Sequence, residues 1–253
     1  MITIKKPEEF QKMAVAGAAV AVVLRSVKEA ASPGVTMKDL DAIAAEIIRS
    51  RDCIPSFLGY HGFPAHICTS PNATIVHGIP GDYRLREGDI LSVDAGAIYE
   101  GFHGDAAITF AIGQVDPKVQ RLLDTTEAGL WAGIQEVKPG ARLGDIGSAV
   151  QAEADRLGYG VVREYVGHGI GRQMHEEPQV PNFGKKGTGM KLRTGMAICI
   201  EPMFNMGGPE TRVEPDGWTV VTADGTLSAH FEHTIGLTED GPVVFTAGDL
   251  SSA

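Results

Sequence analysis

The hydrophobic and polar positions of the chain follow a helical period in four long stretches and a strand period in several shorter ones. The amphipathic stretches, some of them opened by a proline or a capping residue, predict helices at about 7–31, 37–51, 117–138 and 143–157. Prolines, glycines and short β-prone runs between 54 and 89 predict loops and short strands that shape a cleft. Further strands are predicted at 161–166 and 196–201, and a terminal hairpin at 218–222 and 227–237. The pattern therefore indicates a mixed α/β protein.

The helix, Pro-Gly, helix arrangement occurs twice, at Pro33-Gly34 and again 106 residues later at Pro139-Gly140. Because Pro-Gly pairs end many unrelated helices, this repetition alone leaves coincidence open. In both halves, however, the helices are followed by strands that carry acidic residues at apolar positions. We therefore expect two similar halves, about 1–112 and 113–245, within one domain spanning 1–253, and a polar tail at 246–253.

The stretch 92–110 consists of two apolar runs on either side of a glycine-containing turn, and each run carries one aspartate. This pattern is typical of a β-hairpin. A turn centred after Tyr99 would place Asp94 and Asp105 opposite each other, with Cβ atoms roughly 5 Å apart. A bulged three-residue loop would shift that register by one residue. In either register the carboxylates lie close together, and a positive group must compensate their repulsion.

The composition is that of an ordinary globular protein, since 43% of the 253 residues are hydrophobic and 21% are charged. A formal net charge of −10 argues against a nucleic-acid or anionic-membrane partner. The apolar run 14–24 is not a signal peptide, because Glu8 and Glu9 precede it and its pattern continues into a charged helix. No apolar run approaches the ~20 residues that span a bilayer. Three widely spaced cysteines fit neither a disulfide framework nor a zinc site and favour a reducing cytosol.

Four acidic residues, Asp94, Asp105, Glu201 and Glu232, stand within β-prone apolar runs, where an unpaired charge is unfavourable. His168 lies between two glycines, which leave room for a metal or for backbone. Each residue alone has an ordinary structural explanation, as a turn former, a strand-end cap or a core histidine. Together, four carboxylates balance two divalent cations, and the same strands hold no equivalent set of lysines or arginines. Oxygen-rich ligation with one nitrogen favours Mn²⁺, Fe²⁺ or Co²⁺ in a two-metal hydrolytic centre.

Several dispersed motifs accompany these five residues in a fixed order. They are Tyr60-His61-Gly62-Phe63-Pro64, His77-Gly78-Ile79-Pro80, Gly167-His168-Gly169-Ile170-Gly171 and Trp218. With these motifs, the chain from about residue 2 to 237 closely resembles type I methionine aminopeptidases of the bacterial kind. The resemblance implies the pita-bread α/β fold, in which two pseudo-symmetric halves form a curved antiparallel sheet with helices on its outer face.

The resemblance also implies how the metal ions are held. Asp94 would chelate one ion, His168 and Glu201 would hold the other, and Asp105 with Glu232 would bridge them. The pair of ions would activate a water as the nucleophile and polarise the scissile carbonyl. The ions expected from the family are Co, Mn, Fe, Ni or Zn, without a choice among them.

Three residues are assigned catalytic roles by the resemblance. Glu201 would shuttle the proton, His175 would stabilise the oxyanion, and His77 would contact the scissile amide nitrogen. His175 is expected in a loop, because no second histidine follows it at the spacing of a zinc-binding helix and Pro178 interrupts the segment. Asn72 and Ser228 would help to hold a structural Na or K ion.

The resemblance further implies a pocket for a methionine side chain. Its expected lining residues are Tyr60, Phe63, Cys68, His77, Met174 and Trp218, with His175 at the scissile bond. Core packing is the alternative role for these aromatic residues. Phe57 and Met174 depart from the usual family pattern, which has a small residue or cysteine at the first position and an aromatic at the second.

These features predict a cytoplasmic metalloaminopeptidase that removes the initiator methionine from nascent proteins whose second residue is small. Its expected partners are nascent N-termini at the ribosome, without nucleic acid or membrane, and the expected oligomeric state is a monomer. A Pro-directed aminopeptidase, such as aminopeptidase P or prolidase, is the alternative enzyme because it shares the metal set. A non-catalytic binding protein on the same fold is a further alternative.

Overall fold

The computed structural model describes residues 2–248. Its α-helices are α1 (Pro7–Ala30), α2 (Met37–Ser50), α3 (Pro117–Gln135) and α4 (Leu143–Asp155), and a 3-10 helix spans Tyr60–Gly62. Its strands are β1 (Ile54–Pro55), β2 (Ile67–Pro71), β3 (Thr74–Val76), β4 (Ile90–Tyr99), β5 (Phe102–Ala111), β6 (Gly160–Val161), β7 (Gly167–Gly169), β8 (Glu176–Val180), β9 (Ala197–Ile200), β10 (Met203–Asn205), β11 (Thr211–Val213), β12 (Val220–Thr222), β13 (Ser228–His230), β14 (His233–Thr238) and β15 (Gly241–Val244).

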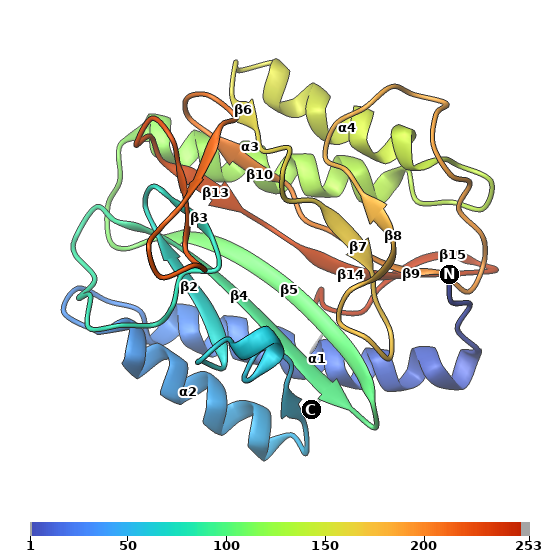
Figure 1. The fold of residues 1–253 in the computed structure, drawn as a ribbon, viewed down its shortest axis with the longest axis horizontal. Coiled ribbons are helices and arrows are strands. Elements are labelled where there is room, and N and C mark those ends of the chain that lie inside the picture. The colour runs from blue at the N-terminus through green and yellow to red at the C-terminus, as the bar shows by residue number, and fades with distance from the viewer. Residues whose placement is uncertain (1, 249–253) are drawn as a thin grey trace.

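The helices lie on two opposite sides of the molecule with the strands between them (Figure 1). Helix α1 packs on β4 and β5, whereas α3 packs on β9, β10 and β13. The strands pair in antiparallel fashion, and the largest sheets have the orders β1-β4-β2, with β5 beside β4, and β15-β14-β9-β7-β8. The predicted mixed α/β architecture, with antiparallel strands covered by helices, is confirmed.

The helices begin where the sequence signals predict. Thr36 precedes α2, and its side chain accepts a hydrogen bond from the N–H of Asp39, whose carboxylate accepts one from the N–H of Thr36. Asp116 caps α3 through the N–H of Lys118, with a proline at the first helical position. These contacts satisfy N–H groups that have no partner inside the helix. The C-terminal ends of the four helices lie one to three residues before the predicted ends.

The two helix pairs use the same hydrogen-bond arrangement. Gly34, between α1 and α2, donates to the carbonyl of Leu85 over 2.8 Å, and Gly140, between α3 and α4, donates to the carbonyl of Leu192 over 3.0 Å. Both glycines have positive φ, of 97° and 85°, which a residue with a Cβ adopts only with strain. The repetition seen in the sequence therefore extends to the backbone.

The hydrophobic core also divides along the chain. One large cluster of buried residues lies within 19–112, under α1 and α2. The buried members of the other lie within 122–237, with Ile90 added from the first half. Ile108 packs against both clusters from the side of β5. The strands between the two helix pairs therefore have one core on each side.

Helix α1 has the length and composition of a membrane-spanning helix, although the sequence pattern did not predict one. Half of its most apolar 18-residue window is buried in the fold. The buried residues include Met13, Val20 and Val23, and the helix packs on β4, β5 and α2. This is how a core helix of a soluble domain packs.

The β4–β5 hairpin closes through a two-residue turn. Tyr99 pairs with Phe102, so Glu100 and Gly101 form the turn. Their φ values are 45° and 79°, and positive φ at both central positions is the mark of a type I′ turn, which matches the twist of the strands. The turn is therefore centred one residue later than in the register that would place Asp94 and Asp105 opposite each other.

This turn changes the register of the two aspartates. Asp94 pairs with Ala107 and Asp105 pairs with Gly96, so the register is neither the directly opposed one nor the one shifted by a single residue. Each aspartate lies two residues from the other's partner, which keeps both side chains on one face of the sheet as diagonal neighbours. Their predicted proximity is retained.

The predicted terminal hairpin does not form. The segment 227–237 is divided into β13 and β14, which pair with β10 and β9, while β12 pairs with β3 and β11. The break between β13 and β14 lies beside the break between β9 and β10, where Pro202 cannot donate to a ladder. Glu201 and Glu232 occupy these two breaks.

Two further expectations need correction. The predicted strand 161–166 is limited to β6, because Arg163 and Glu164 are exposed and the chain bends away from the sheet there. The tail does not begin at 246, because Thr246 is buried and its hydroxyl contacts Nδ1 of His233 at 2.8 Å and the N–H of Thr234 at 3.1 Å. Residues 249–253 of the predicted tail lie outside the described residues.

Candidate active site

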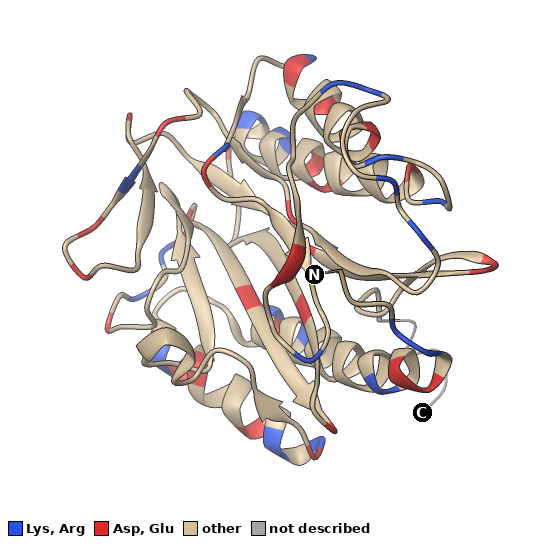
Figure 2. Cartoon of the chain, turned by 45° about the vertical axis from the view of Figure 1, so that its right-hand side comes forward, with Lys and Arg blue, Asp and Glu red and all other residues tan. Residues whose placement is uncertain are grey.

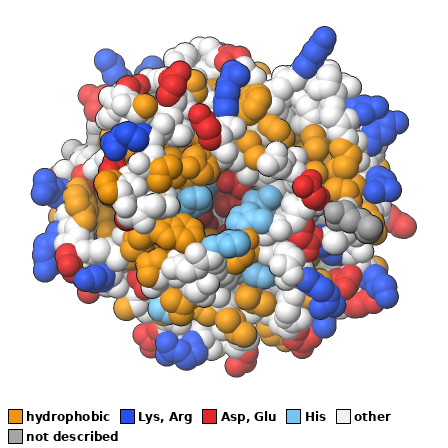
Figure 3. Space-filling model, viewed as in Figure 1, with side chains coloured by type: hydrophobic (Ala, Val, Ile, Leu, Met, Phe, Trp, Pro, Cys, Tyr) orange, Lys and Arg blue, Asp and Glu red, His pale blue; other side chains and the backbone are white. Residues whose placement is uncertain are grey.

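A cavity of about 510 Å³ opens on the face shown in Figure 3. Acidic side chains lie at its bottom, and histidine and hydrophobic side chains surround its mouth. The lining residues are Phe57, Tyr60, His61, Phe63, Cys68, His77, Asp94, Asp105, His168, Met174, His175, Glu201, Trp218 and Glu232. The fold thus brings all five predicted metal ligands and all seven predicted substrate contacts to one cavity.

The five candidate ligands come from both halves of the chain. Asp94 lies on β4 and Asp105 on β5, whereas His168 lies on β7 and Glu201 and Glu232 lie at the strand breaks. The sheets of the two halves meet here, because the N–H of Glu232 donates to the carbonyl of Ala107 over 2.8 Å. The hydroxyl of Thr234 contacts both the N–H and the carbonyl of Asp105, at 2.9 and 2.7 Å. These bonds fix the backbone beneath the carboxylates.

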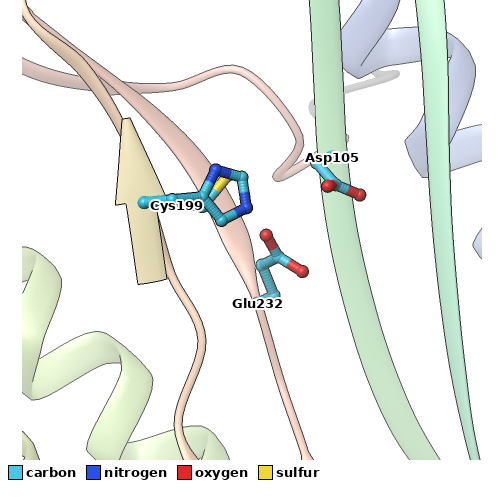
Figure 4. Close-up of side chains that lie close together, drawn as sticks. Asp105, Cys199 and Glu232 are labelled. Carbon is cyan, nitrogen blue, oxygen red and sulfur yellow. The ribbon is translucent and has the colours of Figure 1, made fainter. Parts of the chain in front are cut away.

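The side chains converge closely. Figure 4 shows the carboxylates of Asp105 and Glu232 near the thiol of Cys199. One ligand atom from each of these residues and from His168 lies within 4.8 Å of the others. Nε2 of His168 is 3.6 Å from Oε1 of Glu201. Such spacing allows several of the atoms to reach one cation.

Three carboxylate oxygens of this cluster lack hydrogen-bond partners within the protein. Oδ1 of Asp94, Oδ1 of Asp105 and Oε1 of Glu232 are buried without a hydrogen bond. No lysine or arginine of the described chain lines the cavity, and the basic residues stand mainly on the helices and loops (Figure 2). Buried, unpaired acceptor oxygens are unfavourable unless a cation satisfies them. The donor set therefore fits divalent metal ions.

The pKa values of the carboxyl groups are raised, as expected for buried acidic groups without a cation nearby. Burial raises the pKa of Asp105 to about 7. Burial, together with the neighbouring Asp105 carboxylate, also raises the pKa values of Asp94 and Glu232 well above their usual range, and burial with the charges of Asp94 and Asp105 does so for Glu201. Without a cation, the folded protein therefore binds protons at this cluster.

His168 is prepared to act as a ligand. Its Nδ1–H donates a hydrogen bond to the carbonyl of Gly169, 2.9 Å away. The lone pair on Nε2 is therefore free to bind a cation. Burial lowers the pKa of His168 to about 3, so the imidazole is neutral near pH 7. A neutral imidazole with one nitrogen fixed by a backbone carbonyl is the usual form of a metal-binding histidine.

We expect the metal-free protein to lose stability as the pH rises from 7 to 8.5. Burial raises the pKa of Asp105 from its ordinary value of 3.8 to about 7, and the pKa values of the other three carboxyl groups are raised as well. The folded state thus binds more protons than the unfolded state in this range, and its free energy of unfolding falls as the protons are lost. Buried histidines such as His168, whose pKa is lowered from 6.5 to about 3, have the opposite effect, but at lower pH. Differential scanning calorimetry after chelation should show the Tm falling by ~5 °C or more between pH 7 and 8.5. An unchanged or rising Tm over this range would contradict the clustering of unpaired carboxylates.

The predicted methionine pocket lies beside the acidic cluster. Phe57, Phe63, Ala65, Cys68 and Met174 form one buried hydrophobic cluster, against which Tyr60 and Trp218 pack. The rings of Phe63 and Trp218 meet edge to face with centroids 5.2 Å apart, and those of Phe57 and Phe63 with centroids 6.5 Å apart. Phe57 and Met174, the two residues that differ from the expected pattern, thus belong to one cluster and line the same cavity.

Two further histidines lie at the cavity. The hydroxyl of Tyr60 is 2.7 Å from Nδ1 of His175, which lies in a loop as predicted. Burial and the nearby Asp105 raise the pKa of Tyr60, so its hydroxyl keeps its proton. Burial lowers the pKa of His77 to about 4 and also lowers that of His175. Both imidazoles are therefore neutral groups near pH 7.

Sequence reasoning missed three residues at the site. His61 lines the cavity. Cys199 lies within the ligand cluster, and His230 is buried with Nε2 unpaired, 4.0 Å from a carboxylate oxygen of Glu201 and of Glu232. Cys199 and His230 each stand two positions before a predicted ligand, and the alternation of side chains along a strand could have identified them.

The residues expected to hold a monovalent cation lie next to each other. The N–H of Ser228 donates to the carbonyl of Asn72 over 3.0 Å. The amide of Asn72 is engaged with Asp89 at 2.9 Å and with the N–H of Ile90 at 3.1 Å. The side-chain amide is therefore already bonded within the protein.

Comparison with known proteins places the chain in a family. The model of metallopeptidase family M24 matches residues 11–239. The chain belongs to metallopeptidase family M24. Within this family it is 48% identical over 247 residues to a methionine aminopeptidase of Clostridium acetobutylicum, which covers 97% of this chain and 99% of the relative. It is 46% identical to methionine aminopeptidase 1 of Bacillus subtilis, with coverage of 97% and 99%.

Solved structures of family M24 give the same result. The crystal structure of methionine aminopeptidase from Thermotoga maritima matches with a TM-score of 0.96 at 46% identity, covering 97% of this chain and 99% of that one. The prolidase from Pyrococcus furiosus matches with a TM-score of 0.75 at 20% identity, and the match covers 65% of it. The second match shows the shared pita-bread fold alone. The predicted family and fold are confirmed, and the comparisons favour the methionine aminopeptidases over the Pro-directed enzymes.

Proposed function

We propose that the chain is a methionyl aminopeptidase, a metal-dependent hydrolase that removes N-terminal methionine when the second residue is small. The observation that carries this proposal is the convergence of four buried carboxylates and a neutral imidazole beside an apolar pocket. The acidic cluster supplies the donors for metal ions, and the pocket supplies apolar and sulfur-containing walls for a thioether side chain. The family membership and the methionine aminopeptidase relatives support the same activity.

The positive charge of two divalent ions would balance the negative charge of the four carboxylates. Asp94 would hold one ion, His168 and Glu201 the other, and Asp105 and Glu232 would lie between them. Bound there, the ions would supply Lewis-acid polarisation of the scissile carbonyl and a lowered pKa for water. Co, Mn, Fe, Ni and Zn are all compatible with oxygen-rich ligation containing one imidazole.

His175 is proposed to stabilise the oxyanion. The Tyr60 hydroxyl keeps its proton and lies 2.7 Å from Nδ1 of His175. In the proposed arrangement this hydroxyl donates to Nδ1, so that the ring proton of the neutral imidazole is on Nε2. Nε2 can then donate a hydrogen bond to the carbonyl oxygen as negative charge develops there.

Glu201 is proposed to transfer the proton, and His77 is proposed to contact the nitrogen of the scissile amide. Glu201 lies at a strand break, 3.6 Å from His168, and a carboxylate at the centre can take a proton from the attacking water and pass it to the leaving amine. His77 has φ of 60° and its ring packs against Tyr165 at 5.6 Å. This backbone turn directs the neutral imidazole to the cavity, where it would contact the scissile amide nitrogen.

Release of methionine from synthetic peptides tests the activity. After chelation and reconstitution with Mn²⁺ or Co²⁺, the protein should release methionine from Met-Ala-Ser and leave an X-Pro peptide intact, and the chelated protein should be inactive. Met-Leu-Ser, with a bulky second residue, should be cleaved ~10-fold or more slowly. Cleavage of the X-Pro peptide alone would support the Pro-directed alternative, and no cleavage with bound metal would support a binding protein.

The cellular setting follows from this activity. We propose that residues 1–253 act as one catalytic domain on nascent N-termini at the ribosome, in the cytoplasm, as a monomer that needs neither nucleic acid nor membrane. The net charge of −10 supports the absence of a nucleic-acid footprint. We also propose that Asn72 and Ser228 support a Na or K ion through their backbone, since the amide of Asn72 is already bonded.

A further inference from the structure

The segment that precedes α1 contacts the loop that carries His175. The side chain of Lys5 lies 2.7 Å from Oε2 of Glu176, the residue after His175. The hydroxyl of Thr3 donates to the same carboxylate oxygen, and Lys5 donates to Thr3. The N–H of Lys5 donates to the carbonyl of Gly195 over 2.7 Å, which ties the segment to the second half of the chain.

This ion pair is buried, unlike most others in the described chain. The side chains of Lys5 and Glu176 are 4% and 7% exposed. Burial acts to raise the pKa of Glu176, but hydrogen bonds from Lys5 and Thr3 outweigh it and hold that pKa below its usual range. A buried carboxylate that loses its only cationic partner is strongly disfavoured. The position of Glu176 therefore depends on Lys5.

The loop is built around this carboxylate. The N–H of Gln173 donates to Oε1 of Glu176 over 3.2 Å, which closes the loop around His175. At Gly171 an added Cβ would lie 2.5 Å from Cε of Lys5, so the lysine packs directly against the loop backbone. The carbonyl of Gly171 accepts a hydrogen bond from the N–H of His103, at the start of β5. Lys5 thus lies at the base of the segment 171–176.

We propose that Lys5, through its buried ion pair with Glu176, is a positioning residue that holds the His175 loop in its reactive geometry. The N-terminal segment is then part of the active site, although it touches no substrate. This inference rests on the proposed function and on the proposed role of His175. An imidazole that is displaced by ~1 Å loses much of its effect on a transition state.

A double-mutant cycle tests the proposal. The variants are Lys5→Met, His175→Ala and the combination of both, each measured for kcat, KM and metal content on Met-Ala-Ser. Lys5→Met should lower kcat by roughly 10-fold with unchanged metal content, and Lys5→Arg should recover most of the activity. In the His175→Ala background, Lys5→Met should change kcat by less than ~2-fold, because the group that Lys5 positions is gone.

Controls separate this role from general stability. Lys38→Met removes an exposed ion pair with Asp82, in which the two charged atoms are 2.8 Å apart, and should leave kcat unchanged. Thr3→Val removes a weaker contact to the same carboxylate and should give a smaller loss of kcat in the same cycle. It replaces Lys5→Met in the cycle if that variant does not fold. Equal losses from Lys5→Met or Thr3→Val with and without His175, or no loss at all, would overturn the proposal. An inactive wild-type protein would instead contradict the proposed function.

Discussion

Replacing Asp105 by asparagine should lower kcat/KM for Met-Ala-Ser by ~10³-fold or more and remove at least half of the bound metal. Asp105 is buried, its Oδ1 has no partner in the protein, and it lies within 4.8 Å of ligand atoms of His168 and Glu232. Asparagine keeps the shape but loses the charge that two cations require. Metal analysis by mass spectrometry and peptide assays measure both effects.

The same variant should be more stable than the wild type when metal is absent. The raised pKa values of Asp94 and Glu232 are due in part to the charge of Asp105, so asparagine removes a like-charge repulsion. The Tm of the chelated variant should exceed that of the chelated wild type by ~3 °C at pH 8. Asp145→Asn, at the start of α4, is a matched control that should leave metal content unchanged. A variant of Asp105 that keeps both metal and activity would refute its assignment as a ligand.

Replacing His175 by alanine should lower kcat by ~10²-fold or more while the metal stays bound. The imidazole lies beside His168, with ring centroids 4.3 Å apart, but its Nδ1 is engaged by Tyr60. Its loss therefore removes a hydrogen-bond donor and leaves the carboxylate cluster complete. Stopped-flow or discontinuous assays at saturating peptide separate the fall in kcat from any change in KM.

Histidine replacement elsewhere provides the control for this variant. His66 is bonded to Asp41 at 2.8 Å, away from the cavity lining, and His66→Ala should leave kcat unchanged. If His175→Ala loses its metal, the histidine contributes to metal retention. If its kcat equals that of the wild type, another donor stabilises the oxyanion.

The sequence predicted the helices and the set of acidic residues that gather at the cavity, because both depend on local patterns. The caps at Thr36 and Asp116 are visible within four residues of the chain. A charged residue inside an apolar strand, as at Asp105, also shows in the sequence, since it contradicts the pattern around it. These features needed no knowledge of which strands pair.

Features that depend on distant partners could not be predicted in the same way. The register of the β4–β5 hairpin could not be fixed, because Glu100 adopts positive φ, for which a glutamate gives no signal. The breaks at Glu201 and Glu232 lie side by side, between the pairing of β9 with β14 and the pairing of β10 with β13. The contact between Lys5 and Glu176 joins residues 171 positions apart, and no periodicity reports such a pair.

The bridge between Ala107 and Glu232 joins a strand from the first part of the chain to the segment that connects two strands of the second part. Asp94 and Asp105 belong to the first part, and His168, Glu201 and Glu232 belong to the second. Neither part alone carries a full coordination set. Metal ions bound between these residues would cross-link the two parts of the chain. Removal of the metal would then lower the stability of the fold and abolish the activity together.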